Sequence, residues 1–414
     1  MAEERIDYLL IGGGLAGASA ASALREYGAD GRILLVGREP DPPYERPPCS
    51  KGYLQGSETR EQTFVKQPQW YENNEVELLT RTSVTALDLG ERTATLSDKR
   101  VINFSQALIA TGANVRRLNV PGCELEGIHY LRTLGNADAI RAGAQNAEHI
   151  VLIGGSYIGC EVAASLSMMG KRCSIVMQEQ ITLERGFGRD AGRFFQDVLR
   201  EHGVSIHGAD ELERLEGDGQ VGRVITKGGL ELPADLVVIG AGVVPDVRLA
   251  QNAGIEIGQG GGVRCSALLE SSVPGVFAAG DMCEYDSTIH GRSLRVEHWD
   301  VAVNHGKTAA LNMLGKDTPH EVVPYFFSDL ADWASLEYVG PARDWEKEIV
   351  RGSIEDGKFS VWYVKDGRLA GALSVERSED LEHARRLITE HTTLDEVHLR
   401  TLADAEGDLA QIGG

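Results

Sequence analysis

The sequence lacks the cysteine spacing that builds disulfide frameworks, zinc sites and iron–sulfur clusters. It has 414 residues and only six cysteines, and no two of these form a C-x-x-C pair. Scattered cysteines favour free thiols in a reducing compartment, so we predict a cytoplasmic protein without a metal centre. The start of the chain also lacks the charged-then-apolar pattern of a secretory signal.

Positive charge is scarce as well. The formal net charge of −21 disfavours binding to nucleic acid or to anionic membranes. Residues 8–24 are uncharged and long enough to suggest a marginal membrane span. Their glycines suit a nucleotide-binding fold better, and we therefore expect no membrane association.

Glycine, by contrast, is abundant, with 49 residues, and one glycine-rich stretch near the start organises the chain. Residues 6–17 read IDYLLIGGGLAG, an apolar strand followed by a turn, and a helix of small residues comes next. Gly12 permits the turn, Gly14 lets the backbone approach a pyrophosphate, and Gly17 lets helix and strand pack closely. The free N–H groups and the dipole at the helix start then hold the phosphates.

The same order of strand, turn and helix recurs in residues 149–161, HIVLIGGSYIGCE, with Gly154, Ser156 and Gly159 at the key positions. A chain of this length can hold two or three domains, each with its own core. Two dinucleotide folds predict two bound dinucleotides, with a hydride or electrons passing between them.

Acidic residues near the ends of the second strands are candidates for binding ribose hydroxyls. Residues 32–36 read as such a strand and lead to Arg38 and Glu39, where Arg38 can lie against adenine or a phosphate. A solvated charge pair is the alternative. In the second unit, the strand at 174–177 is followed by Gln178 and Glu179.

The proline-rich residues 42–51 cannot be helical before Cys49, because proline fixes φ and removes a donor. Such a rigid segment presents Arg46 and Lys51 at fixed points. Further short strands are predicted at 76–79, 84–89, 93–96 and 108–109, and the last leads into a turn at Ala110-Thr111-Gly112. Residues 114–147, which include Arg132, are expected to link to the second Rossmann unit.

The later part of the chain changes character twice. Residues 236–239 run into a crossover at 240–245, and a strand at 276–279 delivers Gly280-Asp281 ahead of a helix with Trp299. From about Pro324 we predict an α+β tail with a hairpin between strands 359–364 and 369–375, then a helix at 379–390. We predict an α/β fold of two Rossmann-like domains plus this C-terminal domain, with these bounds: a first dinucleotide domain at 1–115 and 246–323, a second dinucleotide domain at 116–245, and a C-terminal domain at 324–414.

These pieces in this order resemble the two-dinucleotide-fold FAD/NAD(P) pyridine nucleotide-disulfide oxidoreductase superfamily. Within it, the chain is most similar to oxygenase-coupled ferredoxin reductases and apoptosis-inducing-factor-like flavoproteins. The most specific motifs are Arg46-Pro-Pro-x-Ser50-Lys51, Ala110-Thr-Gly112, Tyr130-Leu-Arg-Thr133, Tyr157-Ile-Gly-x-Glu161, Ala278-Ala-Gly-Asp281 and Pro324-Tyr-Phe-Phe-Ser-Asp329.

The resemblance implies the cofactor contacts. The FAD site would be lined by Gly12, Gly14, Leu15, Ala16, Gly17, Arg38, Glu39, Lys51, Val84, Arg132, Asp281 and Trp299. The nicotinamide nucleotide would be held by Gly154, Ser156, Tyr157, Ile158, Gly159, Glu161 and Glu179. Further cofactor contacts are expected at Arg46, Ala110, Thr111, Gly112, Gly242, Gly280 and Phe327.

The resemblance also implies that Lys51 and Glu161, the predicted catalytic residues, form an ion pair beside flavin N5. Such a lysine would favour the reduced, anionic flavin, and the glutamate would hold the lysine in place. Two ordinary surface charges are the alternative.

Some residues depart from the family pattern. Ser156 replaces a glycine, and its β-carbon would loosen the approach of a pyrophosphate. Glu179 favours NADH, whereas Lys171 and Arg172 can be read as a phosphate site for NADPH. Phe327 and Leu330 replace a common tryptophan and glutamine, which favours the apoptosis-inducing-factor-like branch.

We expect an NADH-dependent FAD reductase that passes single electrons to a small iron–sulfur protein of the ferredoxin type, as a monomer or homodimer. Lys66, Arg292 and Lys307 are candidates for a basic docking patch. One alternative is an oxidase or a coenzyme A disulfide or peroxide reductase that uses Cys49, although packing is the favoured role of this cysteine. A second alternative is an NADH-sensing flavoprotein.

Overall fold

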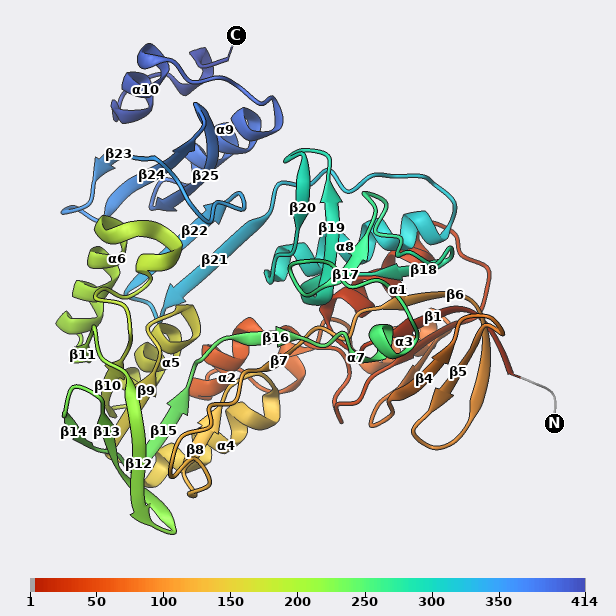
Figure 1. Ribbon diagram of the computed structural model, residues 1–414, viewed down its shortest axis with the longest axis horizontal. Coiled ribbons are helices and arrows are strands. Elements are labelled where there is room, and N and C mark those ends of the chain that lie inside the picture. Colours follow the sequence, from red (N-terminus) through yellow and green to blue (C-terminus); the bar gives the residue numbers. More distant parts are fainter. Residues whose placement is uncertain (1–3, 414) are drawn as a thin grey trace. The chain divides into compact units, whose positions relative to one another are not determined.

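The computed structural model describes residues 4–413 (Figure 1). They divide into two compact units, each built from separate stretches of the chain. Unit 1 contains the chain up to Glu45, Glu61–Asn114 and Val243–Pro324, and unit 2 contains Arg46–Arg60, Val115–Gly242 and the chain from Tyr325 onward.

Unit 1 is built on a seven-stranded sheet with a parallel core. The strand order is β3-β2-β1-β6-β5-β4, and β18 pairs with β6. The bounds are β1 (Glu4–Ile11), β2 (Ile33–Val36), β3 (Val76–Leu79), β4 (Val84–Asp88), β5 (Thr93–Leu96), β6 (Val101–Ile109) and β18 (Val276–Ala278). β1, β2, β3, β6 and β18 pair in parallel, and β2 is fully buried, as expected for a sheet covered on both faces.

Two helices of unit 1 pack closely against each other. α1 (Leu15–Glu26) and α8 (Trp299–Met313) touch where a β-carbon on Gly306 would lie 2.4 Å from the Ala16 carbonyl oxygen. The other elements of this unit are α3 (Pro68–Asn73), α7 (Arg248–Asn252), β17 (Val263–Cys265), β19 (Cys283–Ser287), β20 (Arg292–Leu294) and the 3₁₀ helices η2 (Glu61–Thr63) and η3 (Gly280–Met282).

Unit 2 contains a second Rossmann-type sheet, with the all-parallel order β11-β10-β9-β15-β8. Its strands are β8 (Ile128–Tyr130), β9 (His149–Ile153), β10 (Arg172–Val176), β11 (Ser205–His207) and β15 (Leu236–Ile239). Its helices are α4 (Leu134–Asn146), α5 (Tyr157–Met168) and α6 (Glu184–Glu201), and a small antiparallel sheet is formed by β12 (Leu212–Asp218), β13 (Gln220–Thr226) and β14 (Glu231–Pro233).

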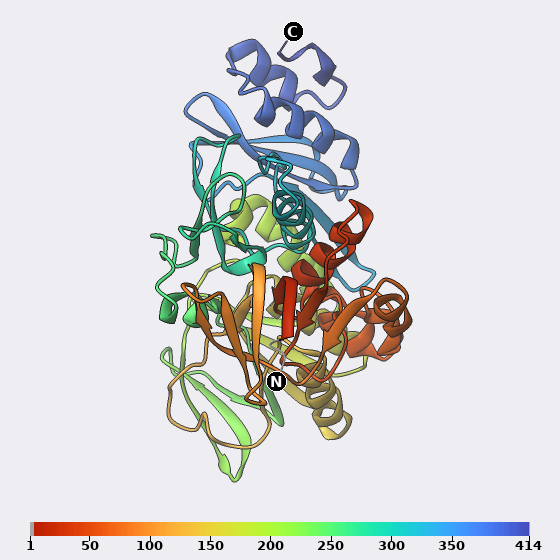
Figure 2. The ribbon, with the colours of Figure 1, turned by 90° about the vertical axis from the view of Figure 1, so that its right-hand side faces the viewer.

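The residues from Tyr325 onward form an antiparallel sheet with the order β21-β22-β25-β24-β23. Its strands are β21 (Tyr325–Leu330), β22 (Ala334–Val339), β23 (Lys347–Ser353), β24 (Lys358–Lys365) and β25 (Arg368–Val375). Figures 1 and 2 show α9 (Ser378–Thr389) and α10 (Glu396–Ala403) on the same side of this sheet, with η4 (Leu409–Gln411) after them. The predicted hairpin is confirmed, because Asp366 and Gly367 both have positive φ between β24 and β25.

Much of the predicted order of elements is confirmed, with two corrections. Residues 114–147 are not a mere link, because β7 (Ala113–Val115), β8 and α4 lie there and β8 joins the sheet of unit 2. The predicted crossover at 240–245 contains the boundary between Gly242 and Val243, and β16 (Val243–Pro245) follows it. The bounds of the three predicted domains stay a prediction, as does the dinucleotide assigned to each of the first two.

The second correction concerns the proline-rich segment. Residues Pro47–Ser50 form a 3₁₀ helix, η1, and α2 (Gly52–Gln55) follows it. The expectation of no helix before Cys49 was wrong, because prolines in the first turn occupy positions whose N–H groups have no intrahelical partner. The segment is anchored within unit 2 by Tyr53, whose hydroxyl donates to Asp138 at 2.6 Å, and by the Ser165 hydroxyl, which donates to the Ser50 carbonyl at 2.7 Å.

A buried arginine ties the C-terminal helices to the antiparallel sheet. Arg351 of β23 donates to the carbonyl oxygens of Thr401, Asp404 and Gly407, and it lies 3.4 Å from the Asp380 carboxylate. Arg351 and Asp380 are both almost fully buried. Burial makes such a pair costly to break, because removal of one partner leaves polar groups without compensation.

We predict that Arg351→Met lowers the free energy of unfolding by about 3–5 kcal/mol. The same substitution at exposed Lys358 is the control and is expected to change it by about 0.5 kcal/mol or less. Denaturant titration followed by circular dichroism measures both. Equal stability of the two variants would contradict an anchoring role for Arg351.

Candidate functional site

The first glycine motif forms a cradle at the carboxyl end of β1. Gly12 has φ +131°, and a β-carbon there would lie 2.1 Å from the Ala110 carbonyl oxygen. A β-carbon on Gly17 would lie 2.2 Å from the Gly12 carbonyl oxygen. Because only glycine fits at these two positions, the ends of β1 and β6 can approach each other at the start of α1.

The start of α1 fits a pyrophosphate. Gly14 is the extended N-cap residue, and within the described residues no side chain caps the helix. No described atom lies within 4 Å of a β-carbon built on Gly14. A helix start with free N–H groups and open space beside a glycine can hold a dinucleotide phosphate. Leu15 and Ala16 form the first turn of this helix, as the predicted contacts require.

The tip of β2 is held by hydrogen bonds within unit 1. Arg38 donates to the Asp246 carboxylate at 2.9 Å and to the Asn114 side-chain oxygen at 2.7 Å. The Thr111 hydroxyl donates to the Asp246 carbonyl at 2.6 Å, and Glu39 accepts a hydrogen bond from the hydroxyl of Tyr44. Asp246 and Asn114 were not among the predicted site residues, although Asp246 follows the predicted crossover at 240–245 and Asn114 begins the stretch 114–147.

Other predicted contacts of the first cofactor also lie in unit 1. Gly280 has φ +75° at the start of η3, and a β-carbon there would lie 3.4 Å from the Ala16 β-carbon. The Gly280-Asp281 turn therefore lies close to the first turn of α1. Val84 begins β4 and Trp299 begins α8.

The second cradle, in unit 2, repeats the geometry of the first. Gly154 has φ +112°, and a β-carbon there would lie 2.5 Å from the Gly240 carbonyl oxygen. A β-carbon on Gly159 would lie 2.1 Å from the Gly154 carbonyl oxygen. Ser156 is the N-cap of α5 with φ −82° and ψ 179°, a conformation that any residue adopts, so the serine causes no backbone strain.

Two further predicted residues follow Ser156 in the cradle. Tyr157 and Ile158 form the first turn of α5, and Ile158 is one of the exposed large apolar residues. Gly242 has φ +87°, and its carbonyl accepts a hydrogen bond from the Arg116 N–H at 2.9 Å.

The acid after β10 has a partner that sequence analysis missed. The exposed Arg185 lies 2.6 Å from the Glu179 carboxylate. Lys171 and Arg172, read above as a phosphate site, lie at the amino end of β10, where Lys171 donates to the Ala147 carbonyl and Arg172 pairs with Glu148. Because β9 and β10 are parallel, Lys171 and Arg172 lie at the amino ends of these strands, whereas the cradle lies at their carboxyl ends. The interpretation of the two residues as a phosphate site was therefore wrong.

Lys51 lies in a cluster of charged side chains within unit 2. Its Nζ is 3.5 Å from the Glu161 carboxylate, 2.7 Å from that of Asp329, and 4.5 Å from the centre of the Phe327 ring. Glu161 is almost fully buried and Lys51 is mostly buried. The predicted ion pair is present, and the alternative of two surface charges was wrong. The catalytic role of the Lys51–Glu161 pair stays a prediction.

Two serines hold the buried carboxylate of Glu161. The Ser328 hydroxyl donates to Oε1 and the Ser50 hydroxyl to Oε2, each at 2.6 Å. Burial raises the pKa of Glu161, whereas Lys51 and the two hydroxyl groups act against this rise. The serines therefore stabilise the charged form of the carboxylate. Ser50, Ser328 and Asp329 belong to the motifs named above, but their partners were not predicted from the sequence.

Arg46 and Cys49 lie just before Lys51 in sequence. Arg46 donates to the Arg132 carbonyl at 2.5 Å. Cys49 lies in η1 with 2% of its surface exposed. A thiol so enclosed has the character of a packing residue, because reactive cysteines are partly exposed.

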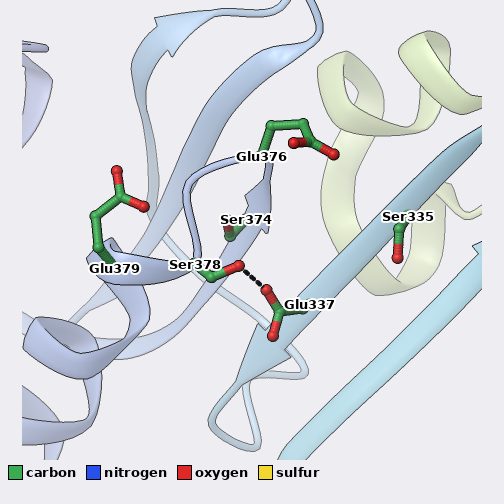
Figure 3. A pocket seen from close by; sticks show the side chains of 6 residues that line it. All are labelled: Ser335, Glu337, Ser374, Glu376, Ser378 and Glu379. Carbon is green, nitrogen blue, oxygen red and sulfur yellow. Dashed lines mark hydrogen bonds between the residues drawn. The ribbon is translucent and has the colours of Figure 1, made fainter.

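A pocket of about 340 Å³ lies on the C-terminal sheet and contains none of the predicted site residues (Figure 3). It is lined only by hydroxyl and carboxyl side chains: Ser335, Glu337, Ser374, Glu376, Ser378 and Glu379. Its wall is nevertheless connected to the lysine cluster, because Ser335 donates to the Asp329 carboxylate at 2.5 Å. Among residues 4–413, no group of three or more His, Cys, Asp or Glu side chains is arranged to hold a metal ion.

We predict that Lys51→Met lowers the free energy of unfolding by about 3–5 kcal/mol and that Lys51→Met/Glu161→Gln restores most of it. The loss should grow as the pH rises and the Glu161 carboxyl ionises. The single variant raises the pKa of Glu161 further, and a raised pKa means that stability is lost as the carboxyl ionises.

Denaturant titration of the four proteins of this double-mutant cycle at several pH values measures the coupling between the two side chains. The control is Lys365→Met, which breaks a more exposed lysine–aspartate pair and is expected to cost about 1 kcal/mol or less. Additive effects of Lys51→Met and Glu161→Gln would contradict the coupling.

Two protein families match this chain, and together their matches cover most of it. Residues 6–306 match the family described as pyridine nucleotide-disulphide oxidoreductase, and residues 325–412 match the reductase C-terminal domain. The chain is 33% identical to the ferredoxin reductase subunit of 5,5′-dehydrodivanillate O-demethylase from Sphingobium sp., over 98% of both chains.

Solved structures of reductases are similar to this structure over nearly its whole length. A ferredoxin reductase for the CYP199A2 system from Rhodopseudomonas palustris has a TM-score of 0.92 and 29% identity, covering 98% of this chain and 99% of the other. The reductase in a covalent putidaredoxin reductase–putidaredoxin complex has a TM-score of 0.90 and 30% identity, covering 97% and 96%. Among the described residues, no helix is long and apolar enough to cross a membrane.

These matches confirm the predicted α/β fold of two Rossmann-like domains plus a C-terminal domain. The family and the names of its ferredoxin–NAD(P)⁺ reductase members imply binding of FAD and NAD(P)H. With matches to both family descriptions and relatives aligned over almost its full length, the chain belongs to the pyridine nucleotide-disulphide oxidoreductase family and carries the reductase C-terminal domain.

Proposed function

We propose that this protein is a cytoplasmic, FAD-dependent reductase that takes a hydride from NADH and passes single electrons to a small iron–sulfur protein of the ferredoxin type in an oxygenase system. The observation that carries the proposal is the presence, in one chain, of two glycine cradles and a mostly buried cluster of one lysine and two carboxylates. The names of relatives aligned over more than nine tenths of both chains, the ferredoxin reductase subunit of an O-demethylase and the ferredoxin–NAD⁺ reductase component of a dioxygenase system, support the same function.

We assign FAD to the cradle of unit 1 and the nicotinamide nucleotide to that of unit 2. FAD supplies the chemistry that a one-electron reductase needs, because it accepts a hydride and gives up electrons singly. The chain itself supplies binding and electrostatics. Helix starts at Gly14 and Ser156 hold the phosphates, and close glycine contacts bring each helix near its strand.

The role that we propose for Lys51 is electrostatic. Its ammonium group lies between two carboxylates, of which Asp329 makes the shorter contact. Ser50 and Ser328 favour the ionised form of Glu161. An ionised Glu161 orients the Lys51 ammonium group, and a fixed positive charge favours the build-up of negative charge on the flavin.

We propose NADH as the preferred nucleotide because of the Glu179–Arg185 pair. A carboxylate at this position can accept hydrogen bonds from a ribose and repels a 2′-phosphate. In the structure Glu179 also engages Arg185, the nearby cation that would otherwise attract a 2′-phosphate. One carboxylate therefore favours NADH in two ways.

We predict that Glu179→Gln raises the ratio of kcat/KM for NADPH to that for NADH by about tenfold or more, because it removes a repulsive charge and frees Arg185. Adding Arg185→Ala should cancel most of the gain, and the exposed Glu201→Gln is the control. Steady-state kinetics with both nucleotides measures the ratio. A higher kcat/KM with NADPH in the unmodified protein would overturn the preference for NADH.

The proposed acceptor raises a problem of charge. Ferredoxins are usually acidic, and a reductase with a net charge of −21 repels them at long range. Docking therefore needs local positive charge, for which Lys66, Arg292 and Lys307 remain our candidates. Rim charges of this kind act mainly on the association rate and weaken as salt screens them.

Cytochrome c reduction with NADH, with and without a small iron–sulfur protein, tests the proposed function. We predict rapid reduction only when the iron–sulfur protein is present and a fall in rate as salt rises through physiological strength. Cys49→Ser should retain most of this activity, since the thiol is enclosed. Loss of turnover in Cys49→Ser with flavin reduction by NADH intact, and no salt effect with any ferredoxin, would instead indicate a disulfide or peroxide reductase.

A further inference from the structure

A buried histidine contacts the Gly280-Asp281 turn and belongs to neither of the two glycine motifs. His305, in the second turn of α8, is completely buried. Its Nδ1 accepts a hydrogen bond from the Gly280 backbone N–H at 3.3 Å. Only a neutral imidazole has an acceptor nitrogen, so this bond requires a neutral His305 with its proton on Nε2.

The environment of His305 opposes a positive charge. The His320 ring lies edge-on at 4.5 Å between centroids and the Tyr285 ring at 4.8 Å. Within the described residues, His305 Nε2 has no hydrogen-bond partner. Burial, with His320 as a second cause, lowers the pKa of His305 well below its usual value.

Four packed elements surround this histidine. The titratable groups that they bring near it are His320 after α8, Tyr285 of β19, and Asp281 in η3, next to the hydrogen-bonded Gly280. α1 meets this part of α8 at Ala16 and Ser19, neither of which titrates. Burial also lowers the pKa of His320, to about 4, so both histidines are neutral at neutral pH.

The turn cannot move without disturbing the first cradle. A β-carbon on Gly280 would lie 3.4 Å from the Ala16 β-carbon, and one on Gly306 would lie 2.4 Å from the Ala16 carbonyl oxygen. The start of α1, the turn and α8 are therefore in contact at one point. Displacement of the turn acts directly on the first turn of α1, where we place the FAD pyrophosphate.

We propose that His305 is a positioning residue for FAD: its neutral imidazole holds the Gly280-Asp281 turn in the conformation that binds the cofactor, and its protonation releases the cofactor. The proposal rests on the FAD site assigned above to unit 1. Protonation turns Nδ1 into a donor that faces the Gly280 N–H, so the hydrogen bond is lost and two donors oppose each other.

Three variants separate this role from simple packing. In His305→Gln, the side-chain oxygen can accept the Gly280 hydrogen bond but does not titrate. In His305→Leu, the side chain fills space without an acceptor, and the Gly280 N–H is left unsatisfied. His320→Gln is the matched control, because it removes the neighbouring ring but not the acceptor.

The experiment follows FAD retained by the FAD-loaded protein after ultrafiltration between pH 7.5 and about 3.5, because burial holds the pKa of His305 well below its usual value, with circular dichroism as the measure of folding. We expect the unmodified protein and His320→Gln to lose FAD in the acid range while still folded. His305→Gln should retain FAD over that range, and His305→Leu should bind FAD about tenfold more weakly even at pH 7.5. Loss of FAD from the unmodified protein and His305→Gln at the same pH, or only on unfolding, would overturn the proposal.

If His305→Gln does not fold, the unmodified protein labelled with ¹⁵N-histidine decides the question. Protonation of the Nδ1 of His305 at the pH of FAD release supports the proposal, and release while Nδ1 is unprotonated overturns it. Failure of the assigned cofactor site is a separate result, because the protein would then bind no FAD at any pH.

Discussion

The buried carboxylate of Glu161 is the interaction on which the candidate site depends. A carboxylate out of contact with water is stable only if its charge is paired and its oxygens are hydrogen-bonded. Lys51 supplies the charge, and Ser50 and Ser328 each donate to one oxygen. These partners come from two distant segments, residues 50–51 at the end of η1 and β21, so one buried charge fixes both segments of unit 2 around α5. The same requirement orients the lysine to which we assign the chemistry.

Both cradles solve one steric problem in the same way. A strand end must approach a neighbouring strand so closely that a β-carbon would overlap a carbonyl oxygen, at 2.1 Å for Gly12 and 2.5 Å for Gly154. The middle position has no such requirement, because Gly14 and Ser156 are both extended N-cap residues. This explains why a serine is accepted in the second cradle without strain.

Local signals in the sequence predicted the cradles and most strands, because glycine spacing and short apolar runs act over a few residues. The Lys51–Glu161 pair was predicted only through family resemblance. Asp329 was missed because its contact with Lys51 spans 278 residues and depends on where β21 lies. His305 was missed because its hydrogen bond to Gly280 depends on how α8 packs against the Gly280-Asp281 turn. Arg185 is close to Glu179 in sequence, but no pattern in the sequence shows that the start of α6 turns its side chain toward that carboxylate. The 3₁₀ helix at Pro47–Ser50 was missed because proline was treated only as a helix breaker.

The central claim is that a fixed positive charge at Lys51 favours the reduced flavin. Spectroelectrochemical titration of the FAD-loaded protein measures the midpoint potential of the bound flavin. We expect a lower potential in Lys51→Met than in the unmodified protein, while Lys365→Met, which alters a more exposed ion pair, should leave it unchanged. Equal potentials in Lys51→Met and the unmodified protein, with FAD still bound, would contradict it.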